Sequence, residues 1–245
     1  MKVIILAAGE GKRLRPLTNN IPKALIKYKS KSLIDYQLSV FKNLGIDDII
    51  IVKGYKADTF NRSDVKFVIN ENYESTNMVY SLFCANQYFS NDMIISYGDI
   101  IFESSIVETL IKSKDNFSVT VSMNWLDLWK QRMKDPLSDA ESLIMDSDGY
   151  ITELGKKVNS YSKIQAQYMG LFRIRNDAVN VVNSLYKTLD RNSLYDGREF
   201  DKMHMTSFIQ QIINQHYPVK GIKITGQWLE IDRPDDLTIE LNKIQ

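Results

Sequence analysis

The sequence predicts an α/β fold, a three-layer, mostly parallel twisted sheet with helices on both faces. Two observations support this prediction. Short runs rich in β-branched residues alternate with amphipathic segments along the first half of the chain, as in successive β-α-β units. The loops at 7–18 and 98–99 both follow such apolar runs, and parallel sheets bind ligands beyond the carboxyl ends of their strands.

The elements follow in order from these patterns. Five apolar runs in the first half predict strands at 2–6, 48–52, 66–69, 93–97 and 117–123. Helices are expected over 33–44, between a Ser32 cap and Gly45, and over 77–88 and 104–114. For the second half we expect a hairpin over 143–154, strands at 165–174, 219–225 and 228–231, and helices at 177–189 and 205–216. Pro234 should open a last helix.

Length, charge and cysteine content indicate a cytoplasmic protein with a sizeable core. The 245 residues are 44% hydrophobic and 25% charged, which is ordinary for a globular domain. A net charge of +1 provides no overall field that would attract nucleic acid or an anionic membrane. The single cysteine, Cys84, forms no internal disulfide. The apolar runs are too short for a signal peptide or a membrane span.

The loop at 7–18 is the most informative segment. Gly9 and Gly11 let backbone amides approach an anion closely. Lys12, Arg13 and Arg15 add positive charge in the same loop. Neither the Walker A order nor the dinucleotide G-x-G-x-x-G is present. The segment is therefore interpreted as a phosphate-binding loop of another kind, and the alternative is a surface loop with solvated charges.

The run LAAGEGKRLRPLTNNIPKALIKYKSKSLIDYQL, residues 6–38, resembles the nucleotidyltransferase signature, in which G-x-G-x-R-L-x-P-L-T is followed by P-K-x-L. The family includes sugar-nucleotide pyrophosphorylases and small cytidylyltransferases. The resemblance implies a Rossmann-like nucleotidyltransferase fold in one domain, 1–245, with a nucleotide-binding half at 1–123 and an acceptor-binding, metal-completing half at 124–245. It implies catalytic contacts from Arg13 and Lys23 to the nucleotide phosphates. The implied nucleotide-binding residues of the strand ends and loop are Leu6, Ala7, Ala8, Gly9, Gly11, Lys12 and Gly98.

Two aspartates are candidate metal ligands. Asp99 follows Gly98 at the end of an apolar run, and Asp232 lies in the segment WLEIDRP. Taken alone, such residues usually serve turns or helix caps. The resemblance implies that both hold Mg²⁺, which takes few protein carboxylates and completes its shell with phosphate oxygens and water. Glu230 is a third candidate, for the metal or for the acceptor.

The resemblance also implies the reaction. An acceptor phosphate or phosphonate is already anionic, so its oxygen can attack the α-phosphorus of the nucleotide in line without a general base. The family uses a second lysine against the acceptor phosphate. Lys157, or its neighbour Lys156, is the candidate for this catalytic role. The alternative is a solvated pair of lysines after a hairpin.

The segment from 70 to 82 indicates the nucleotide. It resembles the cytidylyltransferase pattern N-x-x-Y-x-x-x-N-x-x-x-S-L, which favours CTP. Asn77 and Ser81 are four residues apart, on one helical face, and are expected to contact the base or the ribose. A capped helix with an apolar face is the alternative.

Aromatic and basic residues of the second half suggest the acceptor. The aromatic candidates for a wall around an ammonium group are Trp125, Trp129, Tyr168 and Tyr195. Core packing is the alternative for them. Arginines that could instead pair with a carboxylate are Arg132, Arg173 and Arg198. The run at 200–237 resembles cytidylyltransferases of phosphonate and phosphoramidate chemistry. The candidate acceptors are phosphoglutamine, phosphocholine and 2-aminoethylphosphonate. The plentiful arginines favour phosphoglutamine, which would serve capsule modification.

Two other functions stay open at this point. One is a sugar-1-phosphate nucleotidyltransferase, which would share the fold and the phosphate site. The other is a non-catalytic regulatory domain that binds a nucleotide. Retention of Arg13, Lys23, Asp99 and Asp232 favours an enzyme. The resemblance leaves a homodimer open, and His204 and His216 are given no chemical role.

Overall fold

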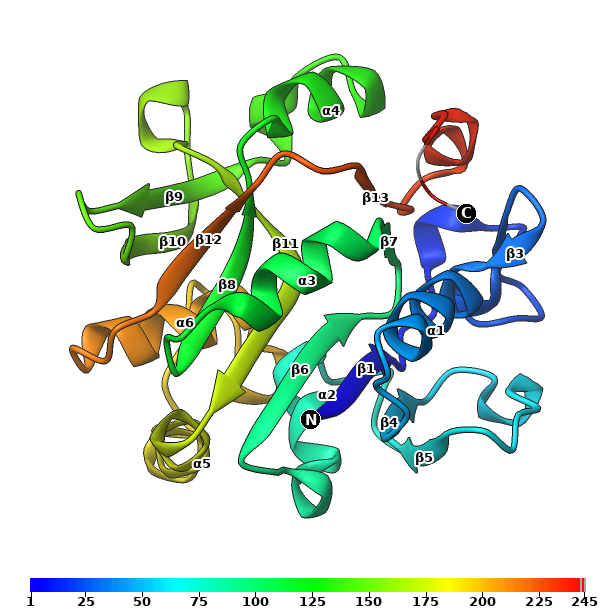
Figure 1. The fold of residues 1–245 in the computed structure, drawn as a ribbon, viewed down its shortest axis with the longest axis horizontal. Coiled ribbons are helices and arrows are strands. Elements are labelled where there is room, and N and C mark those ends of the chain that lie inside the picture. Colours follow the sequence, from blue (N-terminus) through cyan, green and yellow to red (C-terminus); the bar gives the residue numbers. More distant parts are fainter. Residues whose placement is uncertain (243, 245) are drawn as a thin grey trace.

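A seven-stranded sheet forms the centre of the computed structural model, which describes residues 1–242 and 244 (Figure 1). The strand order is β12-β8-β11-β6-β1-β4-β5. The strands are β1 (Lys2–Ala7), β4 (Ile49–Lys53), β5 (Lys66–Ile69), β6 (Asp92–Tyr97), β8 (Phe117–Ser122), β11 (Gln167–Arg175) and β12 (Lys220–Ile224). The neighbours pair in parallel except at β11, which is antiparallel to both β6 and β8. The sheet is therefore mostly parallel, as the sequence predicts.

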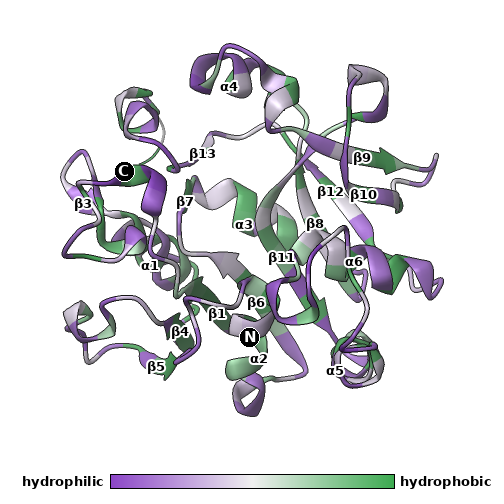
Figure 2. Cartoon of the chain, turned by 180° about the vertical axis from the view of Figure 1, so that it is seen from behind, coloured by the Kyte–Doolittle hydropathy of each residue, from purple (hydrophilic) through white to green (hydrophobic). Residues whose placement is uncertain are grey.

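Helices cover both faces of this sheet. One face carries α1 (Leu33–Asn43) and α3 (Ser104–Lys112), and the other carries α2 (Met78–Cys84), α5 (Asp177–Thr188) and α6 (Met205–Asn214). Alternation along β1 explains the two layers of core: Val3 and Ile5 pack toward α1, whereas Ile4 and Leu6 pack toward α2. Figure 2 shows the hydrophobic residues gathered in the central strands and on the inner faces of the helices.

Smaller elements complete the fold. The predicted hairpin is formed by β9 (Glu141–Met145) and β10 (Ile151–Lys157), and a further helix, α4, spans Trp125–Arg132. Short strand pairs join β2 (Lys27–Tyr28) to β3 (Lys31–Ser32), and β7 (Ile100–Phe102) to β13 (Trp228–Glu230). The 3₁₀ turns lie at Lys12–Leu14, Lys23–Leu25, Ala57–Thr59, Asn86–Tyr88, Pro136–Ser138, Tyr161–Lys163, Phe200–Lys202 and Pro234–Thr238.

Two predicted elements need correction. The helix expected over 77–88 ends at Cys84 and continues only as the 3₁₀ turn from Asn86. The last helix, opened by Pro234 as expected, is a short 3₁₀ turn. The strand expected at 228–231 is confirmed as β13, which lies outside the central sheet. Its partner β7 immediately follows Asp99, so this small sheet joins two distant parts of the chain.

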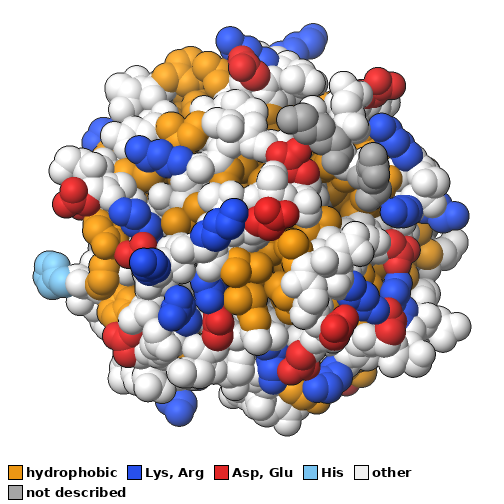
Figure 3. Space-filling model, in the orientation of Figure 1, with side chains coloured by type: hydrophobic (Ala, Val, Ile, Leu, Met, Phe, Trp, Pro, Cys, Tyr) orange, Lys and Arg blue, Asp and Glu red, His pale blue; other side chains and the backbone are white. Residues whose placement is uncertain are grey.

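The surface carries charges of both signs. Figure 3 shows acidic and basic side chains interspersed over one face of the molecule, consistent with the net charge of +1. Across residues 1–242 and 244, no helix is long and apolar enough to cross a membrane.

Candidate active site

The glycine-containing loop after β1 packs directly on Lys23. Gly11 has a φ of 65°, and a β-carbon at this position would lie 2.9 Å from the Lys23 β-carbon. Only glycine fits both the backbone conformation and this close approach. The Thr18 hydroxyl donates to the Gly11 carbonyl at 2.9 Å and closes the loop. A β-carbon at Gly9 would meet nothing within 4 Å, so the backbone there faces open space.

Asp99 is held at the turn between β6 and β7 by a buried glutamine. The Gln37 side-chain amide donates to the carbonyls of Tyr97 and Ile100, both at 2.7 Å. The Ser96 hydroxyl donates to the Gln37 carbonyl oxygen at 2.8 Å. Gln37 is fully buried, so these bonds fix the turn rigidly. Gln37 was not among the predicted site residues, although a glutamine on the apolar face of a helix indicates a buried polar contact.

Asp232 reaches the same place from the end of β13. The Ile231 amide donates to the Asp99 carbonyl at 3.0 Å, which joins the two turns. Asp236 accepts from the backbone amides of Asp232 and Arg233, at 2.7 and 2.8 Å. The Arg132 guanidinium pairs with buried Asp236 at 3.1 Å. This bracing fixes the backbone of Asp232 next to Asp99.

Lys23 lies between the two aspartates. Its Nζ is 2.7 Å from Asp99 Oδ2 and 2.8 Å from Asp232 Oδ1, and Arg13 pairs with the other Asp232 oxygen at 2.5 Å. Burial alone would lower the pKa of Lys23, but the two carboxylates outweigh it and raise that pKa. Burial also opposes ionisation of Asp232, yet the charge of Lys23 lowers its pKa overall. Lys23 and Asp232 are therefore both charged at neutral pH.

The two aspartates fit a magnesium ion. Within the described residues, no group of three or more acidic, histidine or cysteine side chains could hold a metal. Asp99 and Asp232 nevertheless converge on one cation, the Lys23 ammonium. The buried Oδ1 of Asp99 has no hydrogen-bond partner in the described part of the chain. Mg²⁺ needs only one or two carboxylates when phosphates and water supply the other oxygens, so this donor set suits it.

Two cavities meet at this cluster. The loop cavity, of about 380 Å³, is lined by the glycine loop and the acids: Gly9, Glu10, Gly11, Lys12, Arg13, Lys23, Tyr73, Glu74, Met78, Asp99, Glu230 and Asp232. The tyrosine cavity, of about 460 Å³, includes Tyr97 and Tyr168. Both cavities share Arg13, Met78, Glu230 and Asp232. Two ligands can therefore approach the ion cluster, one from each cavity.

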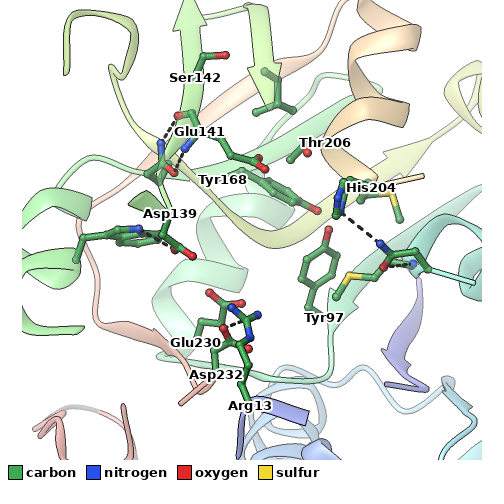
Figure 4. Close-up of a pocket in the computed structure, with 16 residues that line it drawn as sticks. Arg13, Tyr97, Asp139, Glu141, Ser142, Tyr168, His204, Thr206, Glu230 and Asp232 are labelled. Carbon is green, nitrogen blue, oxygen red and sulfur yellow. Dashed lines mark hydrogen bonds and ion pairs between the residues drawn. The ribbon is translucent and has the colours of Figure 1, made fainter. Parts of the chain in front are cut away.

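The tyrosine cavity is acidic and aromatic. Figure 4 shows Arg13, Glu230 and Asp232 on one side, and Glu141 and Tyr168 across from them. Burial raises the pKa of Glu141 to about 7. Burial and the neighbouring Asp99 raise the pKa of Glu230.

Part of the lining of the tyrosine cavity was not predicted from the sequence. Polar residues in short strands and helix caps follow no regular spacing that would indicate a site. The missed residues are Tyr97, Asp139, Glu141, His204 and Thr206. His204 had been given no role, and it lines the cavity beside Asn77, with Nδ1 3.3 Å from the Asn77 amide nitrogen. Burial and nearby Arg198 lower the pKa of His204.

The structure brings most of the predicted loop and metal residues together. Gly9, Gly11 and Lys12 line the loop cavity with the catalytic and metal candidates. The remaining nucleotide candidates lie beneath the loop, at the ends of β1 and β6: Leu6, Ala7, Ala8 and Gly98. Gly98 packs so closely that a β-carbon would lie 2.8 Å from the Leu6 carbonyl oxygen.

Asn77 and Ser81 do not share a site. Asn77 lines the tyrosine cavity, and its side-chain oxygen caps α2 by accepting from the Met78 amide at 2.8 Å. Ser81 lies outside both cavities, is buried, and accepts from the Asn70 side chain at 3.0 Å. The helix turns Ser81 into the core, so the expected pair of side chains does not face one ligand.

The structure does not bring the four aromatic candidates together. Trp129 and Tyr168 line the tyrosine cavity, and Trp129 Nε1 donates to Asp139 at 3.1 Å. Trp125 is buried against Trp129 in the core. Tyr195 lies outside both cavities, where its ring packs on Phe200.

Two arginines considered for a carboxylate-bearing acceptor are used inside the fold. Arg132 pairs with Glu230 and Asp236. Arg173 pairs with Asp92 at 2.8 Å and donates to two carbonyls at the C-terminal end of α3. The prediction that these two arginines bind an acceptor carboxylate is therefore wrong, because buried guanidinium groups require partners within the protein.

The second-lysine candidates lie outside both cavities. Lys156 pairs with Glu153 at 3.0 Å. Lys157, exposed at the end of β10, lines a third cavity together with Lys156.

A basic glycine loop beside two convergent aspartates, at the junction of two cavities, is typical of a nucleotide-transferring enzyme, and comparison with known proteins agrees. Residues 3–140 match the MobA-like NTP transferase domain, more than half of the chain. The chain belongs to this family of nucleotidyltransferases.

Individual relatives narrow the class. The chain is 42% identical over 254 aligned positions to the CTP:phosphoglutamine cytidylyltransferase of Campylobacter jejuni, covering 99% of this chain and 100% of the relative. It is 40% identical over 117 residues to the choline-phosphate cytidylyltransferase of Streptococcus pneumoniae, covering 46% of this chain and 51% of that protein. The solved structure of the inositol-1-phosphate CTP transferase from T. maritima superposes with a TM-score of 0.74 at 22% identity, covering 96% and 90% of the two chains. The predicted nucleotidyltransferase fold is thereby confirmed.

Proposed function

We propose that this chain is a magnesium-dependent cytidylyltransferase that transfers CMP from CTP to a small phosphorylated acceptor and releases pyrophosphate. The observation that carries the proposal is Lys23, held between Asp99 and Asp232 at the junction of the loop and tyrosine cavities. The full-length relative that acts on phosphoglutamine supports CTP as the nucleotide. It also favours phosphoglutamine over phosphocholine and 2-aminoethylphosphonate.

The loop cavity suits the nucleotide triphosphate. Backbone amides near Gly9 and Gly11 can donate to phosphate oxygens. Lys12 and Arg13 add positive charge at the same rim. Both side chains are more than half exposed, so they can turn from their carboxylate partners to an incoming phosphate. Arg13 can bind it with two parallel hydrogen bonds.

The tyrosine cavity suits the acceptor. An acceptor phosphate near Arg13 and Asp232 would face the α-phosphorus of a nucleotide in the loop cavity. Its oxygen forms a new bond to the α-phosphorus, and the bond from that phosphorus to the β-phosphate oxygen breaks. Both bonding electrons leave with pyrophosphate. The attacking oxygen carries no proton near neutral pH, because the second pKa of a phosphate ester is about 6, so the enzyme needs no general base.

Lys23 and Arg13 then provide electrostatic stabilisation. When the triphosphate enters, Lys23 can move from the two carboxylates to the α-phosphate oxygens, where negative charge increases during transfer. Asp99 and Asp232, released from Lys23, would hold Mg²⁺. Bound there, the ion would neutralise phosphate charge and align the reacting groups. The bracing by Gln37 and Asp236 keeps the two carboxylates in position.

A panel of nucleotides and acceptors tests this proposal. Pyrophosphate release should be fastest with CTP and phosphoglutamine, should stop with EDTA and should return with Mg²⁺. UTP, ATP, GTP and glucose-1-phosphate are the comparison substrates, and product mass should equal the acceptor plus CMP. Asp232→Asn should abolish release, whereas Asp235→Asn, at an exposed position of the same turn, should not. A preference for UTP with glucose-1-phosphate would contradict the proposal in favour of a sugar nucleotidyltransferase.

We also propose a setting for the reaction. CTP is available in the cytoplasm, and a CDP-linked acceptor is an activated donor for later transfer. The resemblance to small cytidylyltransferases, with phosphoglutamine as the favoured acceptor, supports a role in capsule or surface-polysaccharide modification. Deletion of the gene should remove the acceptor group from the purified polysaccharide, and an unchanged polysaccharide would argue against this setting.

A further inference from the structure

A third cavity continues from the tyrosine cavity on the side away from the ion cluster. This lysine cavity, of about 480 Å³, contains Lys156 and Lys157. It shares Asp139, Glu141 and His204 with the tyrosine cavity. An acceptor whose phosphate lies at Asp232 would therefore extend its other end past Glu141 into the lysine cavity.

The boundary between the two cavities is acidic. The backbone amide of Glu141 donates to the side-chain oxygen of Gln167 at 3.1 Å, which fixes Glu141 at this boundary. Burial, together with the nearby carboxylates of Asp139 and Asp196, raises the pKa of Glu141 to about 7. Among the ion pairs of the described residues, none involves these three carboxylates. Such a concentration of uncompensated negative charge favours a cationic ligand.

The lysine cavity also contains basic side chains. Lys157 and Arg198 both line it, and neither forms an ion pair within residues 1–242 and 244. Lys156, by contrast, is held by Glu153. The cavity thus holds two cationic side chains without an ion-pair partner in the described part of the chain, together with the acidic side chains named above.

A tight turn holds Arg198 in place. Tyr195 and Arg198 exchange two backbone hydrogen bonds, at 2.8 and 3.0 Å. Asp196 and Gly197 between them have φ values of 49° and 76°, as in a type I′ hairpin turn. The buried Tyr195 ring anchors this turn, and its hydroxyl donates to the Asp190 carbonyl at 2.9 Å. Tyr195, expected to touch the acceptor, instead positions the turn that carries Arg198.

A buried hydroxyl points to a ligand independently of the charges. Ser207 lines the lysine cavity and is 1% exposed. Its Oγ has no hydrogen-bond partner among the described residues. Buried hydroxyls are normally satisfied, so a polar ligand group in the cavity would supply the missing bond.

We propose, building on the cytidylyltransferase function above, that the lysine cavity binds the zwitterionic end of an α-amino acid phosphorylated on its side chain. Glu141 and Asp139 pair with the α-ammonium group, and Arg198 and Lys157 pair with the α-carboxylate. This assignment separates the candidate acceptors by charge. Phosphoglutamine carries both groups, whereas phosphocholine and 2-aminoethylphosphonate carry a cationic nitrogen and no carboxylate.

Kinetics with two acceptors test the assignment. Pyrophosphate release from CTP is measured with phosphoglutamine and with 2-aminoethylphosphonate. Arg198→Gln should lower kcat/KM for phosphoglutamine about 10- to 100-fold more than for 2-aminoethylphosphonate, mainly through KM, because it removes a charge-assisted hydrogen bond to the carboxylate. Glu141→Gln should weaken both acceptors, since both carry an ammonium group. Lys187→Gln, which removes an exposed charge on α5, is the matched control.

The outcomes separate this inference from the function on which it rests. If the wild-type protein releases no pyrophosphate from CTP with any acceptor, the proposed function fails and this inference fails with it. If wild-type protein uses phosphoglutamine, but Arg198→Gln and the double variant with Lys157→Gln reduce both acceptors equally or not at all, only the zwitterion site is wrong. Circular dichroism of each variant confirms folding, and calorimetry of phosphoglutamine binding without CTP should show the same selective loss.

Discussion

Replacing Lys23 by methionine removes the cation between Asp99 and Asp232. At an effective dielectric constant of about 20, each contact near 2.7 Å represents a gross attraction of about 6 kcal/mol. Much of this offsets the desolvation of three side chains that are 9–11% exposed. Removing one partner of a buried pair typically costs about 3 to 5 kcal/mol. Because Arg13 still pairs with Asp232, we expect the lower value.

A loss of about 3 kcal/mol corresponds to a fall in Tm of roughly 6 to 12 °C for a chain of this size. Thermal unfolding with and without Mg²⁺ measures it. In Lys23→Met, Mg²⁺ no longer competes with an ammonium group for the two carboxylates. The ion should therefore raise the Tm of the variant more than that of the wild type, through preferential binding to the folded state.

Lys12→Met is the matched control, because it makes the same substitution in the same loop. The Lys12 side chain is 67% exposed and pairs with Glu10 at 3.1 Å, so its loss should change the free energy of unfolding by less than about 1 kcal/mol. Equal Tm values for the two variants, or an identical Mg²⁺ shift in wild type and Lys23→Met, would refute the view that Lys23 holds the cation position.

Three other changes give sharp expectations. Arg13→Gln should lower kcat with CTP about 100-fold and barely change Tm, because its side chain is 59% exposed; stopped assays with pyrophosphate detection measure it. Gln37→Leu leaves two buried carbonyls without their side-chain donor, so urea unfolding should show a loss of about 2 to 3 kcal/mol, and kcat should fall with it. Because the pKa of Glu141 is raised to about 7 and only its ionised form attracts ammonium, KM for the acceptor should fall as pH rises from about 6 to about 8. In Glu141→Gln, KM for the acceptor should not change with pH over the same range. An equal dependence of KM on pH in the wild type and the variant would contradict the role of Glu141.

Local pattern was sufficient for the fold and for one wall of the site. Short apolar runs that alternate with amphipathic segments predict the strands and helices. Each such pattern depends only on residues close together in the sequence. The loop from Gly9 to Arg13 and the Pro22-Lys23 segment are short motifs whose chemistry is readable without long-range contacts. The predicted pairing of Asp99 with Asp232 came from family resemblance, and no spacing along the chain would have revealed it.

Tertiary structure decided which polar and aromatic side chains reach the site. The pairing of β7 with β13 brings Asp232 beside Asp99, and it depends on contacts between distant segments. Contacts between distant segments also give different roles to residues of the same type. Trp129 reaches a cavity whereas Trp125 enters the core, and Arg132 is neutralised inside the fold whereas Arg198 stays without an ion-pair partner in the described part of the chain.

The sequence by itself determined that this chain forms a mostly parallel α/β sheet whose first loop is rich in glycine and basic residues, because both follow from periodicity and local backbone freedom. Only the folded chain determined that Glu141 and Asp139 line both the tyrosine cavity and the lysine cavity, whereas Lys157 and Arg198 line the lysine cavity. The physical reason is that charge recognition depends on separation in space and on burial, and the chain sets both only when distant elements pack together.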